Sequence, residues 1–141
     1  MNRFQHGDHG DTENTEMDGK ELTGEVIGAA IEVHRLLGPG LLESAYELAL
    51  ERELALCGHT VSRQKKVPLE YKGMSLGDGF RLDLLVDDIL VVEVKAIESL
   101  LPIHEAQLLT YLRLAGKRFG LLVNFNHKVL KEGIRRVVNG Y

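Results

Sequence analysis

Apolar side chains near the start of the chain recur at the spacing of an α-helix. From residue 22 onward they fall every three or four positions, at Leu22, Val26, Ala30, Val33 and Leu37. Thr23 is suited to cap the start of this helix, and Gly38-Pro39-Gly40 ends it. A second helix is predicted over residues 41–57, with a buried side formed by Leu42, Ala45, Ala49 and Leu54. Two helices therefore precede any strand.

From residue 59 the pattern changes to that of β-strands. Residues 59–73 include one predicted strand and a turn at Lys72-Gly73, and Pro68 restricts that strand to a sheet edge or a bulge. The next strands are predicted at residues 76–86 and 89–96. Three consecutive strands with short connections are expected to form an antiparallel meander.

The last third of the chain contains one helix and at least one strand. Pro102 suits the first turn of a helix, which is predicted over residues 103–115. Residues 119–125 are a continuous apolar run, typical of a strand buried on both faces. Residues 129–141 fit either a strand at 134–138 or a short helix. The order α-α-β-β-β-α-β predicts an α/β fold with α+β character, a mixed sheet flanked by helices.

Length and charge favour one domain behind an acidic tail. The 141 residues suit a single domain, and residues 1–21 carry six acidic but only two basic side chains. We therefore expect residues 1–21 to be a disordered tail and residues 22–141 to be the domain. The chain has no apolar run of about 18 residues and no apolar signal core, so no membrane contact is expected and a cytoplasmic location is favoured.

The segment from Asp83 to Lys95, DLLVDDILVVEVK, carries the candidate chemistry. Mg²⁺ prefers oxygen ligands and takes only one or two carboxylates, so Asp83 and Glu93 are candidate ligands, with the backbone carbonyl of Val94 as a third. Lys95 follows Glu93 by two residues and shares its strand face, where an ammonium can orient water or stabilise charge on phosphorus. This set of groups predicts metal-dependent cleavage of phosphodiester bonds.

The loop between the two acids decides whether they can meet. A two-residue turn at Asp87-Asp88 would pair Val86 with Ile89 and place Asp83 on the opposite sheet face from Glu93. A three-residue loop or an equivalent bulge pairs Val86 with Leu90 instead, and sets the acids directly across from each other, about 5 Å apart. We predict the three-residue loop or the bulge.

A solvated hairpin with a cross-strand ion pair is the alternative interpretation of Asp83, Glu93 and Lys95. The surrounding sequence ILVVEVKAI weighs against it, because an unpaired charge buried in an apolar strand costs several kcal/mol. A metal-paired role therefore explains these residues better.

Two further motifs point to a known family. The segment GLLESAY contains Gly40, Glu43 and Tyr46, and Gln107-x-x-x-Tyr111 follows downstream. Together with the acids and the lysine, these motifs resemble the GxxExxY family of the PD-(D/E)xK nuclease superfamily over residues 22–138. The resemblance implies a restriction endonuclease-like core that uses Mg²⁺ or Mn²⁺. It also implies that Glu43 reaches the metal site and that Gln107 supports the catalytic group of Asp83, Glu93 and Lys95.

Several of these side chains also have plain structural interpretations. Glu43 complements the dipole of the second helix in any case. Tyr46 is either a packing residue or a phosphate contact, and the same choice holds for Tyr111. Gln107 either contacts a metal-bound water or a phosphate oxygen, or caps a loop. His104 is either a general base or a surface side chain at a helix start.

The leading hypothesis is a Mg²⁺-dependent nuclease that acts on nucleic acid, with DNA favoured. Basic side chains that either line a phosphate-binding rim or form a solvated face are Arg63, Lys65, Lys66 and Arg81. The alternatives are a non-catalytic module that binds nucleic acid or protein, and a homodimeric resolvase of branched DNA. The sequence contains no helix-turn-helix, zinc finger or stacking motif that would specify base readout.

Overall fold

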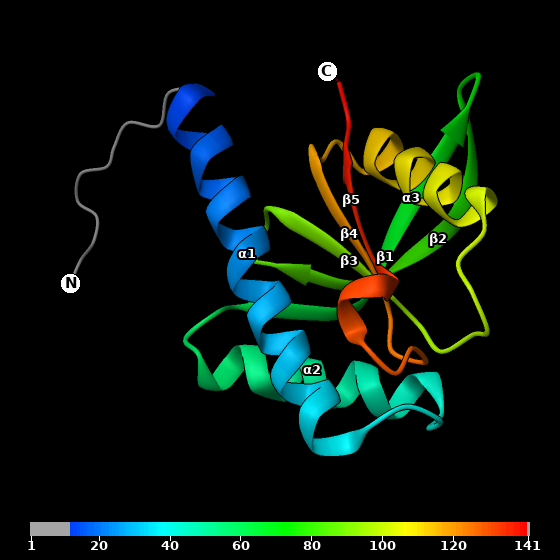
Figure 1. Ribbon diagram of the computed structural model, residues 1–141. Coiled ribbons are helices and arrows are strands. Elements are labelled where there is room, and N and C mark those ends of the chain that lie inside the picture. Colours follow the sequence, from blue (N-terminus) through cyan, green and yellow to red (C-terminus); the bar gives the residue numbers. More distant parts are fainter. Residues whose placement is uncertain (1–11, 141) are drawn as a thin grey trace.

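The computed structural model describes residues 12–140 and has an α/β architecture (Figure 1). Its helices are α1 (Thr12–Leu37), α2 (Glu43–Leu56) and α3 (Pro102–Ala115), with a short 3-10 turn, η2, at Leu130–Gly133. Its strands are β1 (Val61–Tyr71), β2 (Met74–Val86), β3 (Leu90–Lys95), β4 (Phe119–Asn124) and β5 (Ile134–Val138). The predicted element order is confirmed, and the ambiguous final segment contains a strand.

The five strands form one mixed sheet in the order β1-β2-β3-β4-β5. The first three strands are the predicted antiparallel meander. Helix α3 then carries the chain across the sheet, so that β4 runs parallel to β3, and β5 returns antiparallel to β4. The sheet is therefore mixed and mostly antiparallel, as predicted.

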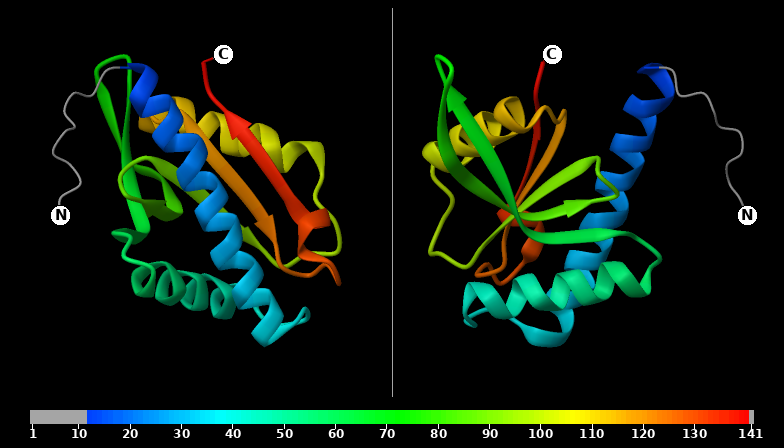
Figure 2. Two further views of the ribbon diagram at one scale, coloured as in Figure 1. Left: turned by 60° about the vertical axis from the view of Figure 1, so that its left-hand side comes forward. Right: turned by 180° about the vertical axis from the view of Figure 1, so that it is seen from behind.

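Helices cover both faces of the sheet (Figure 2). Helices α1 and α2 pack against one face, where Val26, Leu50 and Val92 belong to the larger buried cluster. Helix α3 covers the other face, where Val91 joins Leu108 and other apolar side chains in a smaller cluster. Strand β3 is thus buried on both sides up to Val94, so the side chain of Glu93 lies in the interior, while Lys95 at its end is half-buried.

Helix α1 begins at Thr12, ten residues before the predicted start. The boundary placed at Leu22 was therefore wrong, and Thr23 is not its N-cap: the Thr23 hydroxyl donates a hydrogen bond to the Gly19 carbonyl, 2.7 Å away, inside the helix. Gly19 is buried and lies against the Phe119 ring, so packing onto β4 begins inside the segment predicted to be a tail. Residues 1–11 of that tail lie outside the described part of the chain.

The buried side of helix α2 agrees only in part with the prediction: Leu54 is buried and Ala49 packs against the core, as predicted. Leu42 precedes the helix and is 79% exposed, because the chain is still extended there. The buried side consists of Tyr46, Glu47, Leu50 and Leu54. An acidic residue therefore occupies a position of α2 that faces the protein interior.

The β1–β2 hairpin confirms the prediction for Pro68. Strand β1 is an edge strand, and its register with β2 shifts between Val67 and Pro68. Lys72 and Gly73 form the tight turn, and both have positive φ angles.

Among the described helices, none is long and apolar enough to cross a membrane, although α1 has 26 residues.

The close approach of Gly19 to Phe119 gives a prediction about stability. A methyl group at Gly19 would collide with the Phe119 ring, so we expect Gly19→Ala to lower the free energy of unfolding by about 1–3 kcal/mol. Gly24→Ala in the same helix is the matched control, since a methyl group there meets open space, and it should stabilise by up to about 1 kcal/mol. Urea denaturation measures both. Equal effects of the two substitutions would contradict the packing of α1 on β4.

Candidate active site

The loop between β2 and β3 has the length that brings the two acids together. Val86 pairs with Leu90, so residues 87–89 form the predicted three-residue loop. Asp87 and Asp88 both adopt left-handed backbone angles, with φ of 53° and 58°, which aspartate tolerates better than most residues. This register sets Asp83 across from Glu93, and the prediction is confirmed.

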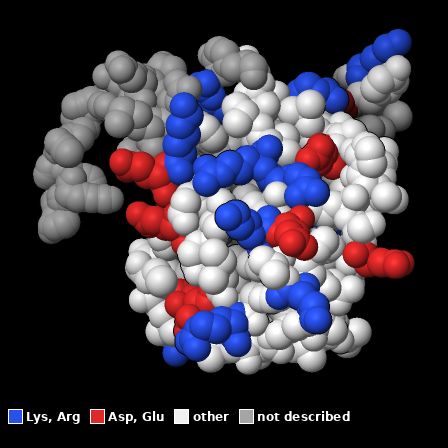
Figure 3. Space-filling view, viewed as in Figure 1, with Lys and Arg blue, Asp and Glu red and all other residues white. Residues whose placement is uncertain are grey.

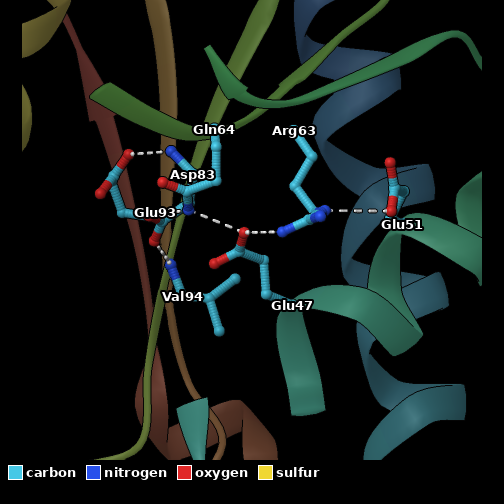
Figure 4. A network of polar contacts seen from close by, with 7 residues as sticks. All are labelled: Glu47, Glu51, Arg63, Gln64, Asp83, Glu93 and Val94. Atoms are coloured by element: carbon cyan, nitrogen blue, oxygen red, sulfur yellow. Dashed lines mark hydrogen bonds and ion pairs between the residues drawn. The ribbon is translucent and has the colours of Figure 1, made fainter. Parts of the chain in front are cut away.

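Asp83 and Glu93 replace the backbone hydrogen bonds that would otherwise continue the ladder. The regular pairing of β2 with β3 ends at Leu84 and Val92. Beyond that point the Asp83 amide donates to Glu93 Oε2 at 3.0 Å, and the Val94 amide donates to Asp83 Oδ2 at 2.8 Å (Figure 4). Each carboxylate therefore satisfies an amide of the neighbouring strand, and the two acids are held side by side.

Burial makes this carboxylate pair electrostatically costly. Glu93 is only 5% exposed, and burial followed by the charge of Asp83 raises its pKa to about 8. Burial also raises the pKa of Asp83, while its bond from Val94 and the charge of Lys95 oppose that rise. A buried and a half-buried carboxylate this close are both ionised only beside a positive charge; otherwise the pair retains a proton.

Lys95 and Glu43 complete the charged centre. Lys95 lies on the same face of β3 as Glu93, and its positive charge lowers the pKa values of Glu43, Asp83 and Glu93. Glu43 lies in the first turn of α2, and the Ala96 backbone also acts to lower its pKa. Burial nonetheless raises the pKa of Glu43. Acids from α2, β2 and β3 thus surround one lysine.

These groups open into a cavity of about 670 Å³. Of the residues predicted to act at the site, the lining includes Glu43, Asp83, Glu93, Lys95, Gln107, Tyr111, Lys66 and Arg81. The lining also includes four residues that the sequence did not indicate, Gln64, Asp78, Gly79 and Phe80. The cavity therefore lies where α3 and the β1–β2 hairpin meet beside the ends of β2 and β3.

Helix α3 presents two of its predicted polar residues to the cavity. Gln107 and Tyr111 are one turn apart, and the Tyr111 ring stacks on Phe80 of the hairpin with centroids 4.4 Å apart. Burial and the nearby acids raise the pKa of the Tyr111 hydroxyl, which therefore stays a hydrogen-bond donor at neutral pH. His104 does not line the cavity, and its Nδ1 accepts a hydrogen bond from the Leu101 amide at 2.9 Å. His104 therefore stabilises the start of α3 and is not part of the cavity lining.

The structure places three predicted substrate contacts outside the cavity. Tyr46 is fully buried: its hydroxyl donates to the Gly38 carbonyl at 2.6 Å and its ring stacks on Phe125. It is a packing residue, because its position on α2 points into the core. Arg63 pairs with acids of α2, and Lys65 lies on the strand beside Lys66 but does not line the cavity. Tyr46 therefore fits the packing interpretation, and the structure does not bring Arg63 or Lys65 to the cavity with the other candidates.

Glu47 and Gln64 lie beside the acids and were missed. Glu47 follows Glu43 by one helical turn, and its position on the buried side of α2 was a signal that the search for apolar residues overlooked. Gln64 gives no such signal, because a single amide on an edge strand is ordinary. Its Nε2 donates to Glu47 and faces Asp83 (Figure 4).

The donor atoms at the site have the chemistry of a hard-cation site. Among residues 12–140, no three His, Cys, Asp or Glu side chains gather closely enough to enclose a metal ion. Two carboxylates with a backbone carbonyl, however, suit Mg²⁺, which keeps several waters. The N–H and C=O of one strand residue lie on the same edge, and the Val94 amide faces Asp83, so the Val94 carbonyl lies on the side of the acids. The oxygen ligands and the excess negative charge fit a divalent cation.

The sheet, its flanking helices and the acid pair beside a lysine together define a nuclease-like α/β domain. The model of the PD-(D/E)XK nuclease superfamily matches residues 20–137, and the chain belongs to that superfamily. No curated protein and no solved structure gave a significant match.

The raised pKa of Glu93 predicts how stability depends on pH without metal. The folded protein binds this proton more tightly than the unfolded chain, so stability should fall as pH rises from about 5 to about 8. Glu93→Gln keeps the shape but cannot ionise, and we expect it to be more stable than the wild type near pH 8 in EDTA, by at least about 1 kcal/mol.

Thermal unfolding at several pH values measures this difference. Glu98→Gln, at an exposed position after β3, is the control and should follow the wild type. If the wild type and Glu93→Gln lose stability equally with rising pH, Glu93 is not the group responsible.

Proposed function

We propose that this protein is a nuclease that hydrolyses phosphodiester bonds with the help of Mg²⁺ or Mn²⁺. The observation that carries the proposal is the pair of the half-buried Asp83 and the buried Glu93, held together by each other's strand amides beside Lys95. The bonds to the strand amides do not by themselves account for the proximity of two acids whose charges repel each other. A cation between them, and a phosphate in the cavity, would account for both the acids and the lysine.

The residues would divide the work as follows. Asp83, Glu93 and the Val94 carbonyl would hold the cation, with Glu43 approaching from α2. When bound, the cation would supply an activated water and neutralise charge on the phosphate. Lys95 would stabilise the negative charge that develops on the phosphate oxygens. Gln107 would orient the attacking water or a phosphate oxygen from the α3 side.

We also place the chain in the GxxExxY family of the superfamily. Gly40 and Glu43 support this placement: Gly40 has a φ of 98°, which suits glycine at the turn into α2, and Glu43 lines the cavity. Tyr46 supports it in another way, since its hydroxyl accepts a hydrogen bond from the Leu41 amide and fixes the loop before α2. The motif would thus place a glutamate at the site and anchor the loop that leads to it.

DNA is our proposed substrate, held by a few basic residues rather than by bulk charge. On the face seen in Figure 3, a short band of basic side chains is flanked by acidic ones, and the whole chain has a net charge of −4. Lys66 and Arg81 are paired across the β1–β2 hairpin and line the cavity beside Phe80. They would contact phosphates next to the scissile bond.

The nuclease proposal is tested by incubating the purified protein with single-stranded DNA, duplex DNA, branched DNA and RNA, with Mg²⁺, Mn²⁺ or EDTA. We expect cutting that needs the metal and that Lys95→Ala reduces at least about 100-fold, because the developing charge loses its partner. Lys65→Ala is the matched control, a lysine outside the cavity, and should cut like the wild type. Binding without metal-dependent cutting would favour the non-catalytic module, and equal cutting by Lys95→Ala would indicate a contaminant.

The basic pair on the hairpin gives a separate prediction about binding. Lys66→Ala and Arg81→Ala should each weaken DNA binding several-fold and make it less dependent on salt, because each removes a phosphate contact. Lys65→Ala should leave both properties unchanged. Fluorescence anisotropy at a series of salt concentrations measures the affinity and its salt dependence. If Lys65→Ala and Lys66→Ala weaken binding equally, a position in the cavity does not determine which lysine contacts DNA.

A further inference from the structure

Gln64 has an unusual backbone conformation for a residue inside a strand. Its φ is 55°, although the residues on either side of it pair regularly with β2, Arg63 with Leu84 and Lys65 with Leu82. A left-handed conformation costs a residue other than glycine about 1 kcal/mol or more, and such residues concentrate at functional sites. Gln64 lies opposite Asp83, so the irregular residue faces one of the two central acids.

The left-handed turn puts two consecutive side chains of β1 on the same side. In a regular strand, neighbouring side chains point to opposite faces. Here both Arg63 and Gln64 reach Glu47 of α2, at 3.4 Å and 2.8 Å. The conformation therefore has a clear consequence, because it directs the Gln64 amide toward α2 and the site.

The Gln64 amide lies between two carboxylates. Its Nε2 is 2.8 Å from Glu47 Oε2 and 3.4 Å from Asp83 Oδ1. The NH₂ group has two hydrogens, so it can donate one to each acid. The reversed orientation of the amide would place its carbonyl oxygen against both carboxylates and is therefore excluded by repulsion.

We propose that Gln64 is a positioning residue that fixes the orientation of the Asp83 carboxylate. This inference rests on the proposed nuclease function. Asp83 Oδ2 is held by the Val94 amide and Oδ1 by Gln64, so both oxygens of the acid have a donor. Glu47 in turn anchors Gln64, and Arg63 links Glu47 to Glu51 at 3.3 Å (Figure 4). A chain of polar contacts, in which Glu47 is buried, thus connects α2 to the acid on β2.

The test compares Gln64→Gly and Gln64→Asn with the wild type. Glycine adopts the left-handed backbone without strain and asparagine tolerates it, but neither side chain can reach both acids. Both variants should therefore remain folded, because relief of the backbone strain offsets part of the cost of the lost bond to Glu47. We expect them to bind Mn²⁺ about 10-fold more weakly, measured by calorimetry without nucleic acid, and to lower kcat about 10-fold or more with little change in KM. Lys65→Ala is the control for the same strand.

The outcomes separate this inference from the function on which it rests. Stable Gln64 variants with weaker Mn²⁺ binding and a lower kcat would support the positioning role. If the wild type binds Mn²⁺ and cuts, and both variants do so equally well, Gln64 only shapes the hairpin and the inference is wrong while the nuclease proposal stands. If the wild type neither binds Mn²⁺ nor cuts, both proposals are overturned.

Discussion

The arrangement of this site depends on a substitution of side-chain hydrogen bonds for backbone ones. Where β2 and β3 stop pairing, the Asp83 and Val94 amides bond to the carboxylates of Glu93 and Asp83. The strands can therefore separate without leaving these buried amides unsatisfied, which would cost about 1–3 kcal/mol for each group. The same bonds hold two acids in contact inside the protein. These two hydrogen bonds therefore have two consequences. They let β2 and β3 separate, which makes room for a substrate, and they position the acids that would act on it.

The irregularity at this point extends across the next strand and shapes the cavity. Leu82 packs under α3 and Leu84 packs under α1 and α2, although two residues of a regular strand would share a face. Opposite them, Gln64 is left-handed. The outer part of the hairpin consequently belongs to the α3 side, where Phe80 stacks on Tyr111. The twist that disrupts the β1–β2 ladder is thus what brings Lys66 and Arg81 into the same cavity as the acids.

The sequence was informative wherever periodicity and turn chemistry act locally. The meander and the helix after Pro102 follow from such rules. The three-residue loop was instead predicted from the requirement that Asp83 meet Glu93, because turn chemistry alone also allowed a two-residue turn at Asp87-Asp88. The start of α1 was missed because its stabilising contact, Gly19 against Phe119, joins residues 100 positions apart. Gln64 was missed for the same reason, since it is not unusual until the fold brings α2 against β1, whereas Glu47 was missed because only apolar residues were sought on the buried side of α2. The motif singled out Tyr46, but the sequence could not decide whether its ring packs in the core or contacts a phosphate.

The buried acids also explain why the surrounding fold is so heavily apolar. Glu93 interrupts a strand whose neighbours are fully buried on both sides, and its raised pKa measures how unfavourable its charge is there. The protein tolerates this because β3 is central and is held by β4, by α3 and by the two N-terminal helices. Moving the same pair to an exposed edge would relieve the repulsion, but it would also let water and mobile ions screen the charge. Burial keeps the negative field of Asp83 and Glu93 strong and directed into one cavity, as the divalent cation that we propose for this site would require.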